Sequence, residues 1–411
     1  MTSPTTGWTL RWIKWGVNDS ELARTTDGGR TWTDVTPAAA AALLSLPDTL
    51  TPVLLARDAE HAWLALCCAG QTATSAGRLT EVFSTSDGGR TWTESGPLHG
   101  PDYGGPASLS FTGPDDGWLL LTTDTGGPAR FGQLYRTDDG GGHWTLAAAG
   151  VPASCDPPSL TVATTSVAWI ACGPPGPLLV SRDAGTHWTP QPLPRSAGAV
   201  PQFIGRTGFM TAGPASGLYL LVTHDLGRTW RRLRLPAGIG VAPDVRFLSA
   251  SDGIVMPYVS PGSRVPVVYV TVDGGRTWTA VPQGLHASDP ELLGYDFVST
   301  RVWFAWYGNQ AQARAQASII YRTDNSGRTW TAITARTAGA LRSWHGVSFG
   351  GTPRTRAAGR RRGPGRRGTR SGRAGPGSSQ GQRRIPPRSA GKRRTPARGT
   401  TAWSSSSRRS A

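Results

Sequence analysis

The sequence is poor in the features that mark several large protein classes. Four cysteines in 411 residues are too few for a disulfide scaffold, and no two have the Cys-x-x-Cys spacing of common zinc sites. No apolar run approaches the roughly 18 residues of a membrane-spanning helix, since the longest covers only residues 38–46. A basic segment followed by an apolar one is missing at the start, so we expect no signal peptide.

Acidic residues are absent from one whole part of the chain. Residues 351–411 contain 18 Lys and Arg but no Asp or Glu, whereas residues 1–350 carry 25 basic and 26 acidic side chains. The formal net charge of +17 therefore belongs to the C-terminal segment. Because Arg, Gly, Pro and Ser dominate this segment, it cannot bury enough apolar surface to offset its ordering entropy. We predict a folded domain over 1–350 and a disordered tail over 351–411.

The folded part contains one short pattern seven times, Ser/Thr-x-Asp-x-Gly-x-Thr-Trp. The copies are spaced 42 to 60 residues apart, which is the period of a propeller blade. The acidic position is Asn in the last copy, and the Thr before the Trp is His143 and His187 in two others. The acidic and tryptophan positions are Asp27, Asp87, Asp139, Asp183, Asp225, Asp273, Asn325, Trp32, Trp92, Trp144, Trp188, Trp230, Trp278 and Trp330.

Each copy has the chemistry of a hairpin turn. An apolar run precedes the pattern, as in 267–270, and a short strand follows around the Trp. The Asp can accept hydrogen bonds from the N–H groups of its own turn, and the Gly permits a positive φ. The Trp is large enough to fill the gap between neighbouring sheets. For His143 and His187 we expect a packing role.

The remainder of each unit repeats as well, and its count predicts a closed ring. An aromatic or apolar strand lies upstream of each hairpin, and a further short strand precedes it in every unit except the first. The chain supplies that missing strand at Val347–Phe349, after the last hairpin. Pairing of this strand with the first sheet would close a seven-bladed, all-β propeller and remove its open edge.

These repeats resemble the Asp-box, or BNR repeat, and cover residues 7 to 349. Such repeats occur in sialidases, sortilin-type receptors, some xyloglucan hydrolases and photosystem II assembly and stability factors. The Gly-Trp strand combined with the T-x-DGG-x-TW turn is most similar to the photosystem-factor-like group. The resemblance implies a β-propeller, an extracytoplasmic location, and an Asp-box that serves folding at the blade periphery.

The resemblance to sialidases does not extend to their functional motifs. Their Phe/Tyr-Arg-Ile-Pro tetrapeptide is absent, and glutamate occurs at only five positions. Other glycosidase chemistry requires two carboxylates about 5 to 10 Å apart, which the sequence cannot place. We expect neither a cofactor nor a metal site, because the seven His show no H-x-x-x-H spacing.

The cysteines permit one structural hypothesis. Cys155 and Cys172 flank two adjacent predicted strands, and antiparallel neighbours can bring cysteines within disulfide range. We predict a bridge between them. Cys67 and Cys68, at the end of another strand, are expected to be buried packing residues.

Two hypotheses account for the basic tail. It could bind an anionic partner such as nucleic acid, with an affinity that falls as salt rises. Alternatively, it could be a shifted reading frame of GC-rich DNA, because its composition changes abruptly at Gly351.

The sequence thus predicts a monomeric, non-catalytic propeller that serves as a binding or assembly scaffold. Loops carry most recognition, so we expect a protein or glycan to bind the axial face that the loops form. The alternative is a secreted glycoside hydrolase of the sialidase-like type.

Overall fold

The computed structural model describes residues 1–14, 19–44, 52–67, 79–99, 104–123, 132–151, 159–172, 177–192, 200–214, 216–240, 243–258, 267–284, 291–308 and 319–333. The chain divides into two units, Met1–Arg356 and Ala357–Ala411, and all described residues belong to the first. The predicted boundary after residue 350, the tail over 351–411 and the closing strand Val347–Phe349 lie outside the described residues.

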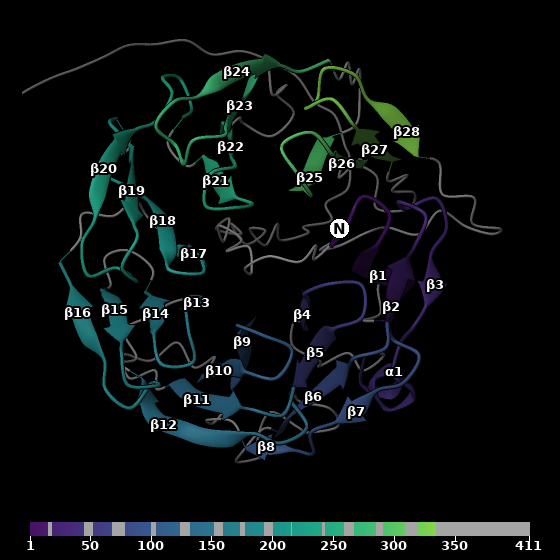
Figure 1. Cartoon of the computed structure of the whole chain (residues 1–411). Coiled ribbons are helices and arrows are strands. Elements are labelled where there is room, and N and C mark those ends of the chain that lie inside the picture. The colour runs from purple at the N-terminus through teal and green to yellow at the C-terminus, as the bar shows by residue number, and fades with distance from the viewer. Residues whose placement is uncertain are drawn as a thin grey trace, which may run out of the picture. The chain divides into compact units, whose positions relative to one another are not determined.

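The described strands form seven antiparallel sheets arranged radially around a centre, which confirms the predicted seven-bladed β-propeller (Figure 1). Blade 1 contains β1 (Gly7–Lys14), β2 (Asp19–Thr25) and β3 (Thr33–Asp34), and blade 2 contains β4 (Val53–Ala56), β5 (Ala62–Cys67), β6 (Leu79–Thr85) and β7 (Thr93–Glu94). Blade 3 is made of β9 (Gly104–Phe111), β10 (Gly117–Thr123), β11 (Gly132–Thr137) and β12 (Thr145–Val151). In blade 2 a further strand, β8 (Leu98–His99), pairs with β6.

The other four blades each have four strands in chain order, from the innermost strand to the outermost. Blade 4 has β13 (Ser159–Val162), β14 (Ala168–Ala171), β15 (Leu178–Ser181) and β16 (Thr189–Gln191). Blade 5 has β17 (Gln202–Ile204), β18 (Thr207–Ala212), β19 (Tyr219–Thr223) and β20 (Arg231–Arg234). Blade 6 has β21 (Asp244–Phe247), β22 (Gly253–Met256), β23 (Val267–Thr271) and β24 (Thr279–Pro282), and blade 7 has β25 (Glu291–Phe297), β26 (Trp303–Gly308), β27 (Ile319–Thr323) and β28 (Thr331–Ile333).

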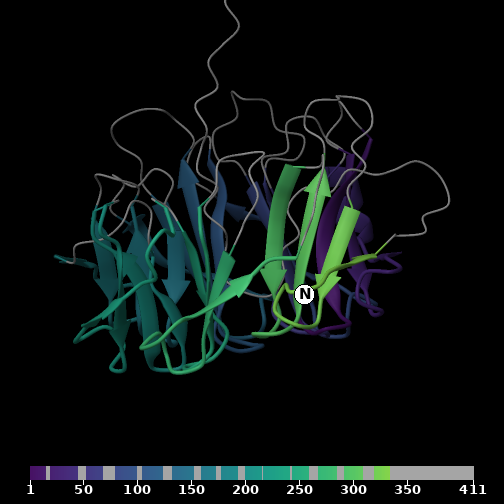
Figure 2. The same cartoon turned by 90° about the horizontal axis from the view of Figure 1, so that it is seen from above.

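The strands run along the axis of the ring, so each sheet packs face to face with its neighbours (Figure 2). The middle strands are apolar on both sides, as in β5, where all six residues are buried. Such continuous burial is expected of strands that are covered on two faces. The hydrophobic core is accordingly divided into clusters that mostly lie between adjacent blades.

The N-terminal residues join blade 7 to blade 1. Met1 is 4% exposed and packs against Phe304, Ile320 and Ile333 of blade 7. The Arg322 guanidinium of the same blade donates a hydrogen bond to the carbonyl of Pro4, at 2.9 Å. Among the described residues, blade 1 has only three strands, and these contacts form the seam between the first and last blades.

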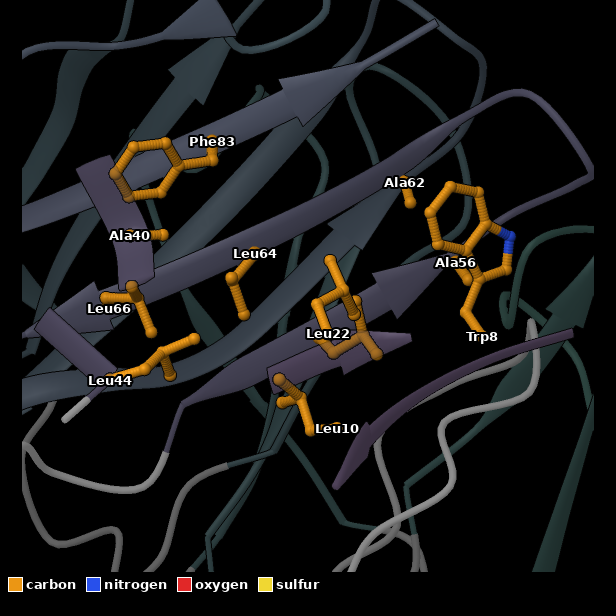
Figure 3. Packing of buried hydrophobic residues seen from close by; sticks show 11 residues of the cluster. Trp8, Leu10, Leu22, Ala40, Leu44, Ala56, Ala62, Leu64, Leu66 and Phe83 are labelled. Atoms are coloured by element: carbon orange, nitrogen blue, oxygen red, sulfur yellow. The ribbon is translucent and has the colours of Figure 1, made fainter. Parts of the chain in front are cut away.

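A short helix that the sequence analysis did not predict covers the outer end of the interface between blades 1 and 2. It is α1 (Ala38–Leu44), which falls within the apolar run noted above. Its residues Ala40 and Leu44 point toward Leu66 and Phe83 of blade 2 (Figure 3). No described helix is long and apolar enough to cross a bilayer.

Both described cysteines are disulfide-bonded. They are Cys67 at the end of β5 and Cys172 just after β14. The prediction that Cys67 is merely a packing residue is therefore wrong, although its side chain is buried. Cys155, the predicted partner of Cys172, lies outside the described residues, so that pairing stays a prediction.

Reduction should measurably destabilise the protein. Loss of a native disulfide typically costs about 2–5 kcal/mol, because the unfolded chain regains freedom. Thermal unfolding, followed by circular dichroism, should show a lower midpoint when a reductant is present. As a control, protein that has been reduced and alkylated should have a midpoint that no longer depends on the reductant. Peptide mapping of unreduced protein checks the pairing, and a Cys155 peptide not linked to Cys172 contradicts the predicted bridge.

Candidate functional site

The seven Asp-box turns share one hydrogen-bond arrangement. The Ser or Thr hydroxyl that opens each box donates to the carboxylate, or to the Asn325 amide oxygen, at 2.7–3.0 Å. The same hydroxyl accepts the N–H of the Gly four residues on, at 2.8–3.0 Å. The carboxylate also accepts the N–H of the residue before the Trp. Each turn therefore satisfies its own polar groups locally.

Every box is also tied to the first turn of its own blade. The N–H of the fourth box residue donates to a carbonyl just before the second strand of the blade, as from Gly88 to Glu60 and from Leu226 to Arg206. In blade 1 the acceptor is Thr5, so the N-terminal residues take the place of that turn. Because the seven bonds occur in all blades, they hold the boxes in equivalent positions around the ring.

The box Gly and Trp contact the preceding blade. A Cβ on Gly227 would lie 2.3 Å from Trp169 of blade 4, and the Trp230 ring meets the Trp169 ring edge to face, with centroids 6.0 Å apart. Trp92 of blade 2 meets Trp8 of blade 1 in the same way. These contacts place the box residues at the joint between blades, where they support the fold.

His143 and His187 do not pack in the interior, so that prediction is wrong. Their side chains are 92% and 81% exposed, and each imidazole Nδ1 lies 2.6–2.7 Å from the carboxylate of its own box. The imidazole occupies the place that a Thr hydroxyl takes in the other boxes with Asp. The substitution is tolerated because either group can donate to the Asp.

The box carboxylates should make the fold resistant to mild acid. Hydrogen bonds from the Thr277 hydroxyl and amide lower the pKa of Asp273 to about 2, and those from His187 do the same for Asp183. A carboxylate whose pKa is lower in the folded state than in the unfolded state stabilises the fold. This stabilisation is complete at a pH above the unfolded-state pKa, near 3.9, and is lost as the pH falls through the folded-state pKa. Urea midpoints should therefore hold between pH 7 and pH 4.5 and fall between pH 4 and pH 2.

Asp273→Asn is the matched variant for this acid effect, because box 7 already carries Asn325. Its urea midpoint should depend less on pH below 4 than that of the unchanged protein. A variant whose acid profile matches that of the unchanged protein would show that this carboxylate does not contribute.

Acidic residues on the innermost described strands occur in blades 6 and 7 alone. Asp296 accepts a hydrogen bond from the Arg246 guanidinium at 2.5 Å and from the amino group of Met1 at 2.6 Å. The Tyr295 hydroxyl donates to Asp244 at 3.2 Å. Burial opposes the charge of Arg246, but Asp296, Asp244 and Tyr295 raise its pKa above the usual value. A glycosidase acid has a raised pKa and a free proton, whereas Asp296 is a buried acceptor in two ion pairs, so this cluster does not favour the hydrolase alternative.

The outermost strand of blade 5 is strongly basic. Of its four residues, Arg231, Arg232 and Arg234 are exposed, and within the described residues none of their three side chains forms an ion pair or a hydrogen bond. The Arg232 guanidinium lies over the Tyr219 ring, 3.8 Å from its centroid. The outermost strands of the six other blades contain no Lys or Arg. We call Arg231, Arg232 and Arg234 the arginine edge.

The surroundings of the arginine edge reinforce its charge. Between residues 199 and 240 the chain has two more arginines, Arg206 and Arg228, both exposed, and one acidic residue, Asp225. Hydrogen bonds within its own box engage that carboxylate and lower its pKa. Blade 5 thus presents a net positive rim on a domain whose total charge is close to zero.

No family model matches the chain. A search of curated proteins finds the photosystem II assembly lipoprotein Ycf48 of Synechococcus sp. (strain CC9902), which is 30% identical over 195 residues. The chain is similar to Ycf48. The match covers 46% of the chain and 53% of Ycf48, so the chain spans about half the length of this relative.

Solved structures give further likenesses of fold. YCF48 from Cyanidioschyzon merolae matches with a TM-score of 0.45 and 16% identity, over 74% of this chain and 94% of that chain. A YCF48 structure with a bound D1 peptide has a TM-score of 0.42 and 14% identity, over 69% and 84%. A prolyl endopeptidase structure has a TM-score of 0.52 and 10% identity, over 84% and 49%. At 10% identity, the similarity to the prolyl endopeptidase concerns the fold alone.

The structure does not gather the predicted box residues into one site, because they are distributed around the ring, one box per blade. Among the described residues, no group of three or more His, Cys, Asp or Glu side chains is placed to hold a metal. The arginine edge was not among the predicted site residues. The signal was three arginines at positions 231, 232 and 234, directly after a box Trp, where the other six copies have no Lys or Arg in the four residues that follow the Trp.

Proposed function

We propose that this chain is a non-catalytic β-propeller scaffold that binds an acidic segment of a protein partner at the arginine edge of blade 5. The observation that carries the proposal is the confinement of exposed arginines without an ion pair to one of the seven outermost strands. The other six blades serve as a comparison, because a residue type that the outermost strand needs for folding would recur in them. The arginines do not recur, which favours a role in binding.

The chemistry of the edge favours carboxylates. Guanidinium groups bind carboxylates with two parallel hydrogen bonds, and stacking on Tyr219 holds the Arg232 group in place. The edge lies on the outermost strand of its blade, at the outside of the ring, whereas small-molecule substrates are bound in concave sites. A macromolecule therefore fits the position better than a small substrate.

The similarity to Ycf48 supports a role in assembly. That relative is named as an assembly protein, and a scaffold that holds a partner needs an exposed, rigid surface rather than a catalytic centre. The disulfide-bonded cysteines are typical of an oxidising compartment, which agrees with the extracytoplasmic location we expect. The axial loops predicted to form the binding face lie largely outside the described residues, so they stay a second candidate surface.

The proposal can be tested with a fluorescein-labelled ten-residue peptide of alternating Glu and Thr. Fluorescence anisotropy should show binding that weakens as NaCl rises from 50 to 300 mM, because salt screens exposed charges. Arg232→Glu/Arg234→Glu should lower the affinity at least about tenfold, which corresponds to about 1.4 kcal/mol.

A matched control is Arg276→Glu/Arg328→Glu in boxes 6 and 7, which changes two exposed arginines on other blades and should leave the affinity within about twofold. Equal loss in both variants would point to net charge alone and contradict the proposal. Phosphatidylserine vesicles that bind as well as the peptide, and lose binding in the same double variant, would assign the edge to a membrane surface instead.

A further inference from the structure

The strand that carries the arginine edge is also a regular, unpaired sheet edge. β20 pairs with β19 without a register shift, from Arg231 opposite Val222 to Arg234 opposite Tyr219. Within the described part of the chain, no strand pairs with its outer side. Its outward backbone N–H and C=O groups are therefore open to an added strand.

The other outermost strands are less suited to accept one. β3 and β7 have two residues each, and β16 and β28 have three. β12 is longer, but its register against β11 shifts twice, and β24 ends on Pro282. Short strands, bulges and prolines are ways in which proteins block edge pairing, so β20 is the exception in this ring.

We infer that the acidic partner segment binds as an extended strand added to the outer edge of β20. This inference rests on the proposed function and specifies its binding mode. In strand addition, main-chain hydrogen bonds supply affinity and alternate side chains supply specificity. The positive charge of the edge favours an acidic segment, because that segment would neutralise arginines that form no ion pair within the described part of the chain.

The alternation of the strand defines the motif. Successive side chains of a strand point to opposite faces, so Arg232 and Arg234 share one face of the sheet and Arg231 lies on the other. A segment with acidic residues two positions apart would place both carboxylates beside Arg232 and Arg234. Four residues of β20 span about 13 Å, so the recognised motif is about four to five residues long.

Backbone N-methylation separates strand addition from charge attraction alone. Two versions of the Glu-Thr peptide are needed, one methylated at the Glu nitrogens and the other at the Thr nitrogens, because alternate N–H groups of a strand face opposite sides. Both keep the charge of the parent peptide. An added strand uses one set only, so one version should lose at least about tenfold in affinity while the other stays within about threefold.

The outcomes distinguish the binding mode from the proposed function. Equal binding of both methylated peptides and the parent overturns strand addition and leaves the acidic docking surface in place. An equal loss of affinity in both methylated peptides also overturns strand addition, because a strand added to one edge uses only one of the two sets of N–H groups. If the parent peptide itself fails to bind, the proposed function fails, and the strand inference fails with it. Hydrogen exchange gives a second readout, because strand addition should slow exchange of β20 amides and Arg232→Glu/Arg234→Glu should abolish that protection.

Discussion

Gly227→Ala should be among the most destabilising single substitutions in the domain. Its φ of +78° is unfavourable for any residue with a Cβ, and that Cβ would lie 2.3 Å from the Trp169 ring. Left-handed strain costs about 1–2 kcal/mol, and overpacking of a well-packed core adds about 1–3 kcal/mol. We expect the free energy of unfolding to fall by about 3 kcal/mol, measured by urea denaturation.

Gly238→Ala is the matched control. It lies in the connection that follows β20, has a φ of +76°, and has no atom within 4 Å of the added Cβ. Only the backbone term of about 1–2 kcal/mol should remain. Equal losses in the two variants would show that contact with the preceding blade contributes nothing, and that the box glycine is required for its backbone conformation alone.

Asp296→Asn should cause a loss of similar or larger size. The substitution leaves the Arg246 side chain, which is only 13% exposed, with one carboxylate fewer, and removing one partner of a buried ion pair typically costs about 3–5 kcal/mol. Urea denaturation of the variant at pH 7 measures the change. A loss below about 1 kcal/mol would mean that Asp244 alone neutralises the arginine.

Two comparisons isolate the buried pair. Asp324→Asn breaks the ion pair between Asp324 and Arg322. The Asp324 side chain is 64% exposed, so the loss should cost less than about 1 kcal/mol. Arg246→Met/Asp296→Leu removes both charges of the buried pair and should recover most of the stability lost in Asp296→Asn, because apolar replacement of a buried ion pair is often neutral. Failure to recover would assign the loss to the Met1 contact with Asp296.

The propeller was predictable because its defining features are local and repeated. An eight-residue turn with fixed Asp, Gly and Trp positions marks each blade, and each turn satisfies its hydrogen bonds within itself. Seven such turns fix the blade number even though any single one is short. The helix α1 was missed although its Ala and Leu residues are strong helix formers, because the run was judged only by its length and hydrophobicity; in the fold it packs on blade 2.

The candidate site depends on relations that a single sequence does not display. That Arg231, Arg232 and Arg234 occupy an unpaired outer edge follows only once β20 is known to be the last strand of its sheet. The buried pair of Arg246 and Asp296 joins residues 50 positions apart on two blades. His143 and His187 were assigned to the interior because the Thr they replace looked like a packing residue, whereas the position is a hydrogen-bond donor at the surface.

The contact between each box and the aromatic residue of the preceding blade has a consequence for how such rings can change in evolution. At most blade interfaces the Asp-box of one blade contacts an aromatic residue of the preceding blade. A duplicated blade inserted between two others therefore carries both the box and the aromatic residue that its two interfaces need. Whole blades can therefore be gained or lost without redesign of the interfaces, as long as the seam that joins the first and last blades is preserved. The seam is then the one joint that any change in blade number must preserve, and here it depends on contacts of Met1, Pro4, Asp296 and Arg322.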